Sequence, residues 1–590
     1  MFKGTFGQAI FQSTMPDGYR PTGNFGVKEI KTNLINLARK DPDKFALVAP
    51  KIKKLGDEFS TYEGLSVGLD DIEPEYSKRD PILRSARSAL KKTTNPEQIS
   101  KILHSAQQKM LAVTQTHQGD MGLMARSGAK GNMTQLMKAV ASPVVVGDPS
   151  GRPVPYLFER GYGEGLSPAE AWIGAVEARH QGNEANTAVS APGEMSKIMN
   201  QNMNRLVVSQ ADCGTSNGIM MDAKDPSIIG RYLAGSNSLI DSMKRRSLSK
   251  KGGKVKVRSS LSCELDEGIC QKCSGRDAYD KDPDIGMNIG ARSAQALTEP
   301  LSQMALSSRH GVSLVKGDAD KPTGLRAFRQ TVEMPESFYM RAPVAELSGK
   351  VESINKAPQG GYDLKIGGAN HYVPPNRKLK VKPGQVVESG DVLSSGVPSP
   401  SDIIKHKGIG AGRQHMVHAL KEVYQDSGIQ VDQKHLEMAA RSQINYVKAL
   451  DRVGDVLPGE IVPYQAARKA FSESGVKSPV SKSIGKVLTK PTLHHLPGTT
   501  VNKLMVRDFK DAGIGSIEVS NTSPKFEPVA VSASRTPLLN PNWMQRLGWR
   551  YQKQTLINAA TSGESADLSG MNPISALVSG TIGRKEKGRY

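Results

Sequence analysis

The chain has 590 residues, of which 37% are hydrophobic, so it can build several packed domains and is not a disordered chain. Its 79 Lys and Arg exceed its 58 Asp and Glu, and the net charge of +21 favours a polyanionic partner. Nucleic acid is the first candidate, and an anionic membrane is the alternative. No apolar run reaches the roughly 18 residues of a spanning helix, and the N-terminus is too polar for a signal peptide. We therefore expect a cytoplasmic protein with no membrane segment.

Residues 24–116 show mainly helical patterns. Val27, Ile30, Leu34 and Leu37 are spaced as one buried helix face, and another amphipathic helix is predicted over 99–116. The loop 127–131 that follows sets small residues around Lys130. Such a loop can bring a lysine and backbone N–H groups to a phosphate, but an ordinary helix-loop-helix turn is the commoner use of the pattern.

Two helical runs come next. Ser167 is a predicted N-cap with Pro168 at the first helical position, and the second run covers 194–208. Met195, Met199 and Met203 lie one above another in that run, a spacing typical of core residues. Pro192 lies between the runs, so a continuous helix here must be kinked or broken.

All four cysteines lie within 61 residues of one another: Cys213, Cys263, Cys270 and Cys273. A Cys-x-x-Cys pair and two further thiols are the ligands of a closed, tetrahedral Zn²⁺ site, which is structural because no position is left for water. Two disulfides or free buried thiols are the alternative. Nothing at the N-terminus directs the chain to an oxidising compartment, which favours one zinc ion.

Beyond the cysteines the sequence predicts a β module followed by further helices. Short strands and turns over 344–396 predict a small β-barrel or β-sandwich, with a turn at Pro358–Gly361. Helices are predicted again over 412–450 and 543–560, and the basic residues 583–590 read as a solvated end.

Taken in order, five segments resemble the C-terminal half of the β′ (largest) subunit of multisubunit DNA-dependent RNA polymerases. They are LMARSGAKGNMTQL (123–136), which is similar to a loop near the secondary channel; GEGLSPAEAW (163–172), similar to the lead-in of the bridge helix; 177–208, similar to the bridge helix itself; RSSLSCELDEGICQKCSGRD (258–277), similar to the zinc module; and IGARSAQALTEPLSQMALSSRHG (289–311), similar to the trigger loop.

The resemblance implies an α+β, multidomain and mostly helical chain with a long bridge helix, a four-cysteine zinc module, a trigger helix-loop-helix and the small β module. The implied regions are 1–110 (helical pore and funnel), 111–165 (secondary-channel loop), 166–212 (bridge helix), 213–280 (zinc module), 281–340 (trigger loop), 341–400 (small β module) and 401–590 (clamp-proximal and C-terminal region).

The resemblance also implies residue roles. His310 would approach the β-phosphate of the incoming NTP as a positional catalyst or general acid, and Gln303 and Leu306 would meet its sugar and base. Lys130, where the family usually has arginine, and Arg179 would face the substrate channel. For His310 an exposed loop histidine is the alternative.

Mg²⁺ chemistry in this family needs an Asp-rich loop of the Asn-Ala-Asp-x-Asp-Gly-Asp type, which does not occur in the sequence. We therefore expect the Mg²⁺ to be held mainly by another subunit of a split β′. Asp280, Asp282 and Asp284 have suitable spacing, but they lack the Asn-Ala lead and the glycine. Ser307 and Arg309 replace the usual arginine and aromatic of the trigger loop. In this divergence the chain resembles a phage-encoded split polymerase, active in the host cytoplasm, more than a cellular or plastid enzyme.

The expected partners are an N-terminal β′-like polypeptide with the Asp-rich loop, β-like subunits, a specificity factor, DNA template, RNA and NTPs. The expected function is therefore a subunit of a DNA-directed RNA polymerase that is active only in the assembled complex. The alternative is a non-catalytic, zinc-braced, nucleic-acid-binding scaffold or regulator derived from such a subunit.

Overall fold

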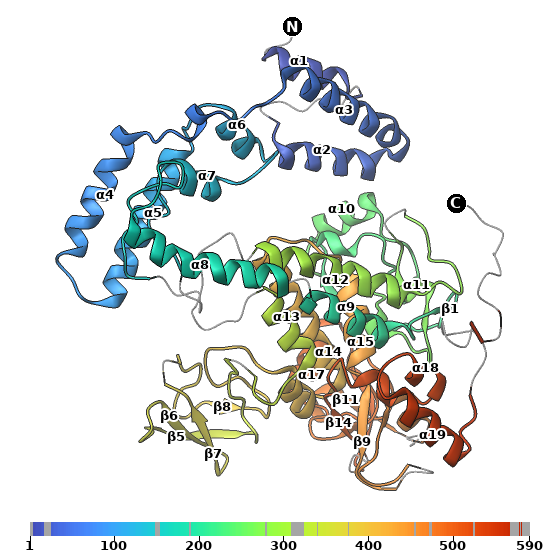
Figure 1. The fold of residues 1–590 in the computed structure, drawn as a ribbon. Coiled ribbons are helices and arrows are strands. Elements are labelled where there is room, and N and C mark those ends of the chain that lie inside the picture. The colour runs from blue at the N-terminus through green and yellow to red at the C-terminus, as the bar shows by residue number, and fades with distance from the viewer. Residues whose placement is uncertain are drawn as a thin grey trace. The chain divides into compact units, whose positions relative to one another are not determined.

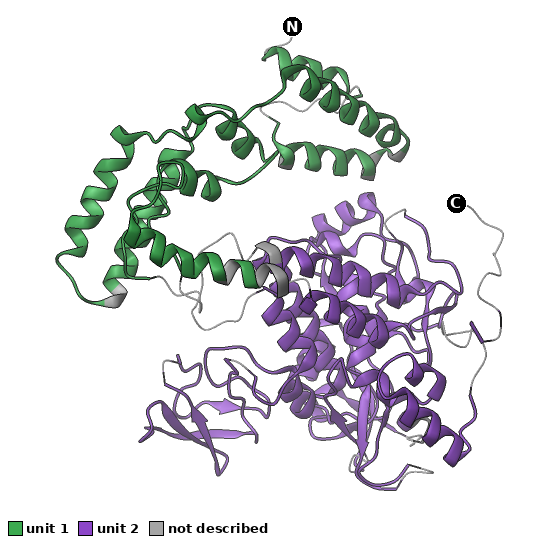
Figure 2. Ribbon diagram, viewed as in Figure 1, with its two compact units in different colours: residues 1–187, 306–316 green, residues 188–305, 317–590 purple. Residues whose placement is uncertain are grey.

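The computed structural model describes residues 4–16, 25–147, 154–187, 190–277, 280–307, 324–338, 340–375, 377–452, 456–470, 475–522, 526–566, 577–578 and 580. The described chain is a mixed α+β protein with mostly helical secondary structure, as the sequence predicted (Figure 1). It divides into two compact units, residues 1–187 with 306–316 and residues 188–305 with 317–590 (Figure 2). Among the described residues, no helix is long and apolar enough to cross a membrane.

Unit 1 is built from helices. They are α1 (Phe6–Ser13), α2 (Val27–Lys40), α3 (Pro42–Glu63), the 3-10 turn η1 (Leu69–Ile72), α4 (Tyr76–Leu90), α5 (Pro96–Thr114), α6 (Asp120–Ser127), α7 (Met133–Val140) and α8 (Pro168–Thr187). Leu83, Leu103 and Met137 belong to the core that joins α4, α5 and α7. In the smaller core of α2 and α3, Leu37 is fully buried, whereas Val27 is 53% exposed, so its predicted burial was wrong. Val27 is the first residue of α2, at the end of the helix face that Leu37 buries.

Unit 2 combines short sheets with a set of helices. The helices are α9 (Ser190–Met203), η2 (Pro226–Ile228), α10 (Ser242–Lys251), η3 (Ser260–Ser262), α11 (Gln271–Ser274), α12 (Ile289–Ser307, in unit 2 up to Ala305), α13 (Gly324–Glu333), α14 (Pro400–Asp426), α15 (Gln433–Gln443), α16 (Tyr464–Ala470), η4 (Val480–Lys482), α17 (Lys503–Asp511), η5 (Thr536–Leu539), α18 (Trp543–Leu547) and α19 (Gln552–Ser562).

The strands of unit 2 form five small sheets. β1 (Val208–Gln210) pairs in parallel with β4 (Ile269–Cys270), and β2 (Ile219–Asp222) pairs antiparallel with β3 (Lys254–Val257). The antiparallel order β7-β6-β5-β8 joins Ala369–Val373, Tyr362–Ile366, Gly349–Lys356 and Val386–Val387. Two three-stranded sheets follow, β10-β9-β14 (Ile461–Pro463, Tyr446–Ala449, Phe526–Val529) and β11-β13-β12 (Val476–Pro479, Ser516–Ser520, Val487–Leu488).

The predicted β module is present as the single four-stranded sheet β7-β6-β5-β8. Val351, Leu364 and Val373 lie in its apolar core. Gly360 and Gly361 have φ of 85° and 83° in the turn between β5 and β6, a region open to glycine. The helices predicted over 412–450 are α14 and α15, but α14 already begins at Pro400 and strand β9 begins at Tyr446.

The predicted bridge segment contains α8 and α9, and residues 188–189 between them lie outside the described set. α8 begins at Pro168 as predicted, because the Ser167 hydroxyl accepts a hydrogen bond from the Glu170 amide at 3.3 Å. α9 begins two residues before Pro192, since a proline in the first helical turn removes no intrahelical hydrogen bond. The methionine prediction is confirmed: Met195, Met199 and Met203 are buried in the main core of unit 2.

Candidate functional site

The four cysteines lie at the ends of short elements that pair with one another; we call residues 208–275 the four-cysteine module. β1 leads to Cys213, and its parallel partner β4 carries Cys270, so the two segments lie side by side. Gly268 makes this possible, because a Cβ there would be 2.3 Å from the Val207 carbonyl oxygen and its φ is 65°. Cys270 is also the N-cap of α11, which brings Cys273 back one turn later.

The four thiols converge on one point. Their Sγ atoms all lie within 4.8 Å of one another, none is in a disulfide, and only Cys213 is partly exposed. The Cys213 and Cys273 Sγ atoms are 3.8 Å apart, and about 3.8 Å is also the edge of a tetrahedron with the usual Zn–S length. The ligand set therefore fits a structural Zn²⁺ site without an open position.

A buried arginine faces the thiols. Arg258 is 1% exposed, and its guanidinium donates to Cys213 and Cys273 at 3.3 Å and to Cys270 at 3.5 Å. It also donates to Asp212 at 2.8 Å. Zn²⁺ with four thiolates carries a net negative charge, and a guanidinium in this place balances it.

The carboxylate beside the site is held ionised. Burial alone would raise the pKa of Asp212, but hydrogen bonds from Lys272, the Gly214 amide and Arg258 outweigh it and lower the pKa to about 2. The Lys272 ammonium is 2.8 Å from Asp212. Asp212 therefore holds Lys272 and Arg258 around the thiols.

Helices α14 and α15 hold the loop that carries Cys263. Arg413 of α14 and Arg441 of α15 are buried and donate to backbone carbonyls on both sides of that cysteine. The accepting carbonyls are Leu261 at 3.3 Å for Arg413, and Ser260 at 3.0 Å, Cys263 at 2.8 Å and Leu265 at 2.9 Å for Arg441. The position of the Cys263 thiol is thus set by residues about 150 to 180 positions further along the chain.

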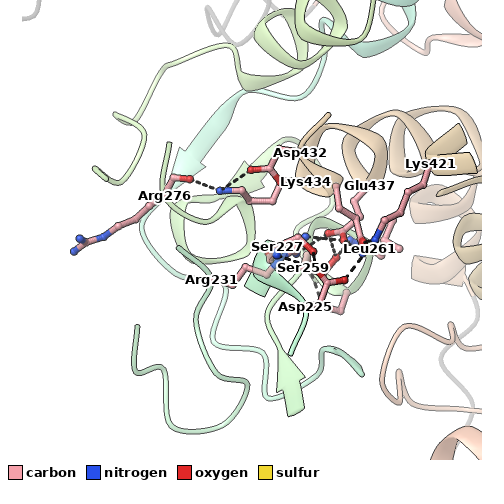
Figure 3. Close-up of polar contacts among 12 residues, drawn as sticks. Asp225, Ser227, Arg231, Ser259, Leu261, Arg276, Lys421, Asp432, Lys434 and Glu437 are labelled. Carbon is pink, nitrogen blue, oxygen red and sulfur yellow. Dashed lines mark hydrogen bonds and ion pairs between the residues drawn. The ribbon is translucent and has the colours of Figure 1, made fainter. Parts of the chain in front are cut away.

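A buried ion pair joins the same partners (Figure 3). Arg231 and Glu437 of α15 are both 1% exposed and form two hydrogen bonds of 2.8 Å. The Glu437 carboxylate also accepts from the Ser259 hydroxyl at 2.7 Å and the Gln433 amide at 3.0 Å. Burial alone would lower the pKa of Arg231, but the charge of Glu437 raises it, so the guanidinium stays charged although it is buried.

Helices α9 and α12, from the bridge-like and trigger-like segments, are in contact. The Thr298 hydroxyl donates to the Ser196 hydroxyl at 3.2 Å. A Cβ at Gly290 would be 1.9 Å from the Met203 carbonyl oxygen, so only glycine allows this approach. Both helices contribute side chains to the main core, which also contains three of the cysteines.

One face of α12 is polar and exposed. Gln295, Glu299 and Gln303, spaced four residues apart, point away from the buried Leu297 and Leu301. Their side chains make no hydrogen bond or ion pair with any other residue that the structure describes.

The other residues predicted to contact substrate lie in different parts of the chain. Leu306 is in the last turn of α12, with its side chain outside the description, and His310 lies outside the described residues altogether. Lys130 is exposed in the loop between α6 and α7, where Gly128 (φ 78°) ends one helix and Asn132 caps the next. Arg179 is exposed on α8.

The aspartates of segment 280–284 have structural partners. Asp282 accepts two hydrogen bonds of 2.8 Å from the Tyr232 hydroxyl, and Asp280 pairs with Arg276 at 3.2 Å. In the described part of the chain, potential metal ligands converge in threes or fours at the four cysteines and at His494, His495 and Asp508, and not here.

Sequence reasoning missed the residues that support the cysteines: Arg231, Arg258, Arg413, Glu437 and Arg441. Arg258 stands in the same motif as Cys263, so its place there was a usable signal. Arg413, Glu437 and Arg441 lie on the distant helices α14 and α15, and a charged residue on a helix is usually expected to be exposed to solvent.

The sequence of this chain is similar to sequences of known proteins. Residues 345–454 match the family described as RNA polymerase Rpb1, domain 5. The chain is 26% identical to the DNA-directed RNA polymerase subunit beta' of Moorella thermoacetica over 83% of its own length and 46% of that protein, and 28% identical to that of Heliobacterium modesticaldum over the same shares. For Symbiobacterium thermophilum the identity is 26%, over 91% of this chain and 48% of the relative. The chain thus spans about half the length of these relatives. Over most of its length, the chain is similar in sequence to β′ subunits of DNA-directed RNA polymerase.

Proposed function

We propose that this chain is a C-terminal, β′-like part of a multisubunit DNA-dependent RNA polymerase and supplies a bridge helix (α8 and α9) and a trigger loop for nucleotide addition. The observation that carries the proposal is the contact of α9 with α12 beside the four converging cysteines. Homology to β′ subunits over most of the chain supports it.

In this proposal, Cys213, Cys263, Cys270 and Cys273 hold one structural Zn²⁺. The site joins the segment after α9 to the segment before α12, so it fixes the two helices relative to each other. The hydrogen bonds from α14 and α15 transmit that rigidity to the C-terminal region.

The exposed face of α12 is proposed to meet the incoming nucleotide. Gln303 and Leu306 would contact its sugar and base, and His310 would approach the β-phosphate and donate a proton to the departing pyrophosphate. Closure of this segment over the nucleotide would align the triphosphate and exclude water. An exposed amide such as Gln303, with no partner among the described residues, is available for such contacts.

We propose that Lys130 and Arg179 line the channel through which NTPs enter. Both side chains are exposed, and their positive charge favours triphosphates. In this proposal, the Mg²⁺ of the assembled enzyme would be held mainly by an Asp-rich loop on an N-terminal β′-like polypeptide. Other proposed partners are β-like subunits, a specificity factor, DNA and RNA. Ser307 and Arg309 support a divergent, phage-encoded version.

Helix α8 offers a surface for a partner subunit. Trp172 is 81% exposed and Val176 46% exposed, one turn apart on the same face. Large apolar side chains gathered on one helix face are typical of surfaces that a partner covers.

Affinity purification tests the proposal. The tagged chain, expressed with its native partners, should co-purify with a polypeptide bearing an Asp-rich loop and with β-like subunits, and the complex should make RNA on a DNA template. Trp172→Ser should reduce recovery of the partners, whereas Met243→Ser, which changes a similarly exposed (79%) side chain on α10, should not. A monomer that binds DNA without making RNA would favour the alternative, a zinc-braced scaffold or regulator.

A further inference from the structure

A second group of metal-ligating side chains lies outside the four-cysteine module. His494 and His495 are 3% and 1% exposed, and Asp508 projects from α17 towards them. One ligand atom from each residue lies within 4.8 Å of the other two. The His495 Nε2 is 3.2 Å from the Asp508 carboxylate, and the two imidazole centroids are 4.0 Å apart.

Two ring nitrogens in this group are buried without a partner. The Nε2 of His494 and the Nδ1 of His495 have no hydrogen-bond partner among the described residues. Buried polar atoms are normally satisfied, and a metal ion between these residues would give the Nε2 of His494 a partner.

The surrounding chain is shaped to hold the two histidines. Leu493, just before them, has φ of 56°, a strained value for a residue with a side chain. The side chain of Asn217, in the four-cysteine module, forms two hydrogen bonds with the turn 491–497. It donates to the Pro491 carbonyl at 3.1 Å and accepts from the Leu493 amide at 3.0 Å. Gly410 of α14 lets the turn approach, because a Cβ there would be 2.7 Å from the His494 carbonyl oxygen.

We propose that His494, His495 and Asp508 bind a divalent first-row transition-metal ion such as Zn²⁺. Two imidazoles and one carboxylate are a donor set that suits this class of ion, and a fourth position would remain for water. The ion would fasten the turn 491–497 to α17, and Asn217 would couple that turn to the four-cysteine module. This site is independent of the proposed polymerase function, since it rests on the three side chains alone.

Metal analysis of the full-length chain tests the site. The purified chain, equilibrated with Zn²⁺ and freed of excess ion, should contain two equivalents of zinc. Asp508→Asn, which keeps the size of the side chain, should contain one. The control Asp511→Asn changes an exposed carboxylate of the same helix, paired with Lys254 at 3.1 Å, and should keep both.

Absorption spectroscopy of the Co²⁺-substituted protein distinguishes loss of the second metal from loss of the fold. With Co²⁺ in place of Zn²⁺, Asp508→Asn should keep the sulfur-to-cobalt charge-transfer band of the cysteine site and lose only the second equivalent. Zinc in the unaltered chain limited to one equivalent, bound by the cysteines, would overturn the proposal. So would a second equivalent that persists in both Asp508→Asn and His494→Ala.

Discussion

The four-cysteine module and the exposed face of α12 differ in the burial and pairing of their polar side chains. Around the cysteines, Arg231, Arg258 and Glu437 are almost completely buried and all are paired. On α12, Gln295 and Gln303 are exposed and have no side-chain partner in the described part of the chain. Buried paired groups specify a structure, whereas exposed unpaired groups remain available for an external ligand.

The buried residues around the cysteines stabilise the fold, whereas we propose that the exposed residues of α12 contact the nucleotide. Substitutions near the cysteines should change stability and metal content. Substitutions on the face of α12 should change nucleotide addition and leave the fold intact.

Removal of a cysteine should have the largest effect. Cys270→Ser is expected to lose the zinc of the four-cysteine site, and structural zinc sites bind with apparent free energies on the order of 10 kcal/mol. The module should then open, which limited proteolysis within 208–275 would detect alongside metal analysis. Glu267→Gln, an exposed neighbour in the same loop, should keep its zinc and resist the protease. Full zinc content in Cys270→Ser would contradict the assigned ligand set.

The buried ion pair should come second. Glu437→Gln leaves Arg231 buried without its counter-charge, which costs about 3 to 5 kcal/mol of unfolding free energy. Denaturant unfolding followed by circular dichroism measures it. The control Glu422→Gln removes a 49% exposed carboxylate of α14 and should cost less than about 1 kcal/mol. Equal costs for the two variants would show that the pair does not hold the module to α15.

Arg258 should tune the metal site without being a ligand. Arg258→Gln removes the charge that faces three thiolates. Loss of a supporting residue of this kind typically lowers metal affinity about 10- to 100-fold. Competition with a chromophoric chelator would show it, with the exposed Arg246→Gln as control. Unchanged zinc affinity would mean that Asp212 and Lys272 suffice to organise the site.

The smallest effect on stability should come from α12. Gln303→Ala changes an exposed side chain, so the unfolding free energy should stay within about 0.5 kcal/mol of the unaltered value. Nucleotide addition by the assembled enzyme should nonetheless slow, because the contact that we propose between Gln303 and the NTP sugar would be lost. A large loss of stability with normal addition would reverse the roles assigned to the two regions.

Local signals in the sequence predicted some parts of the molecule and not others. The spacing of the cysteines, the methionine stripe of α9 and the N-cap at Ser167 depend on nearby residues, and each has its predicted structure. The long-range partners could not be predicted, since Arg441 reaches carbonyls more than 170 positions away. Strands β10 to β14 were also missed, because they are short and take their pairing from tertiary contacts.

The most direct test is the rate of single-nucleotide addition by the complex purified through this chain, with and without His310→Ala. We predict template-directed RNA extension that becomes at least about tenfold slower in the variant, with zinc content and melting temperature unchanged. Equal rates for the two complexes would contradict the proposed role of the trigger-like segment.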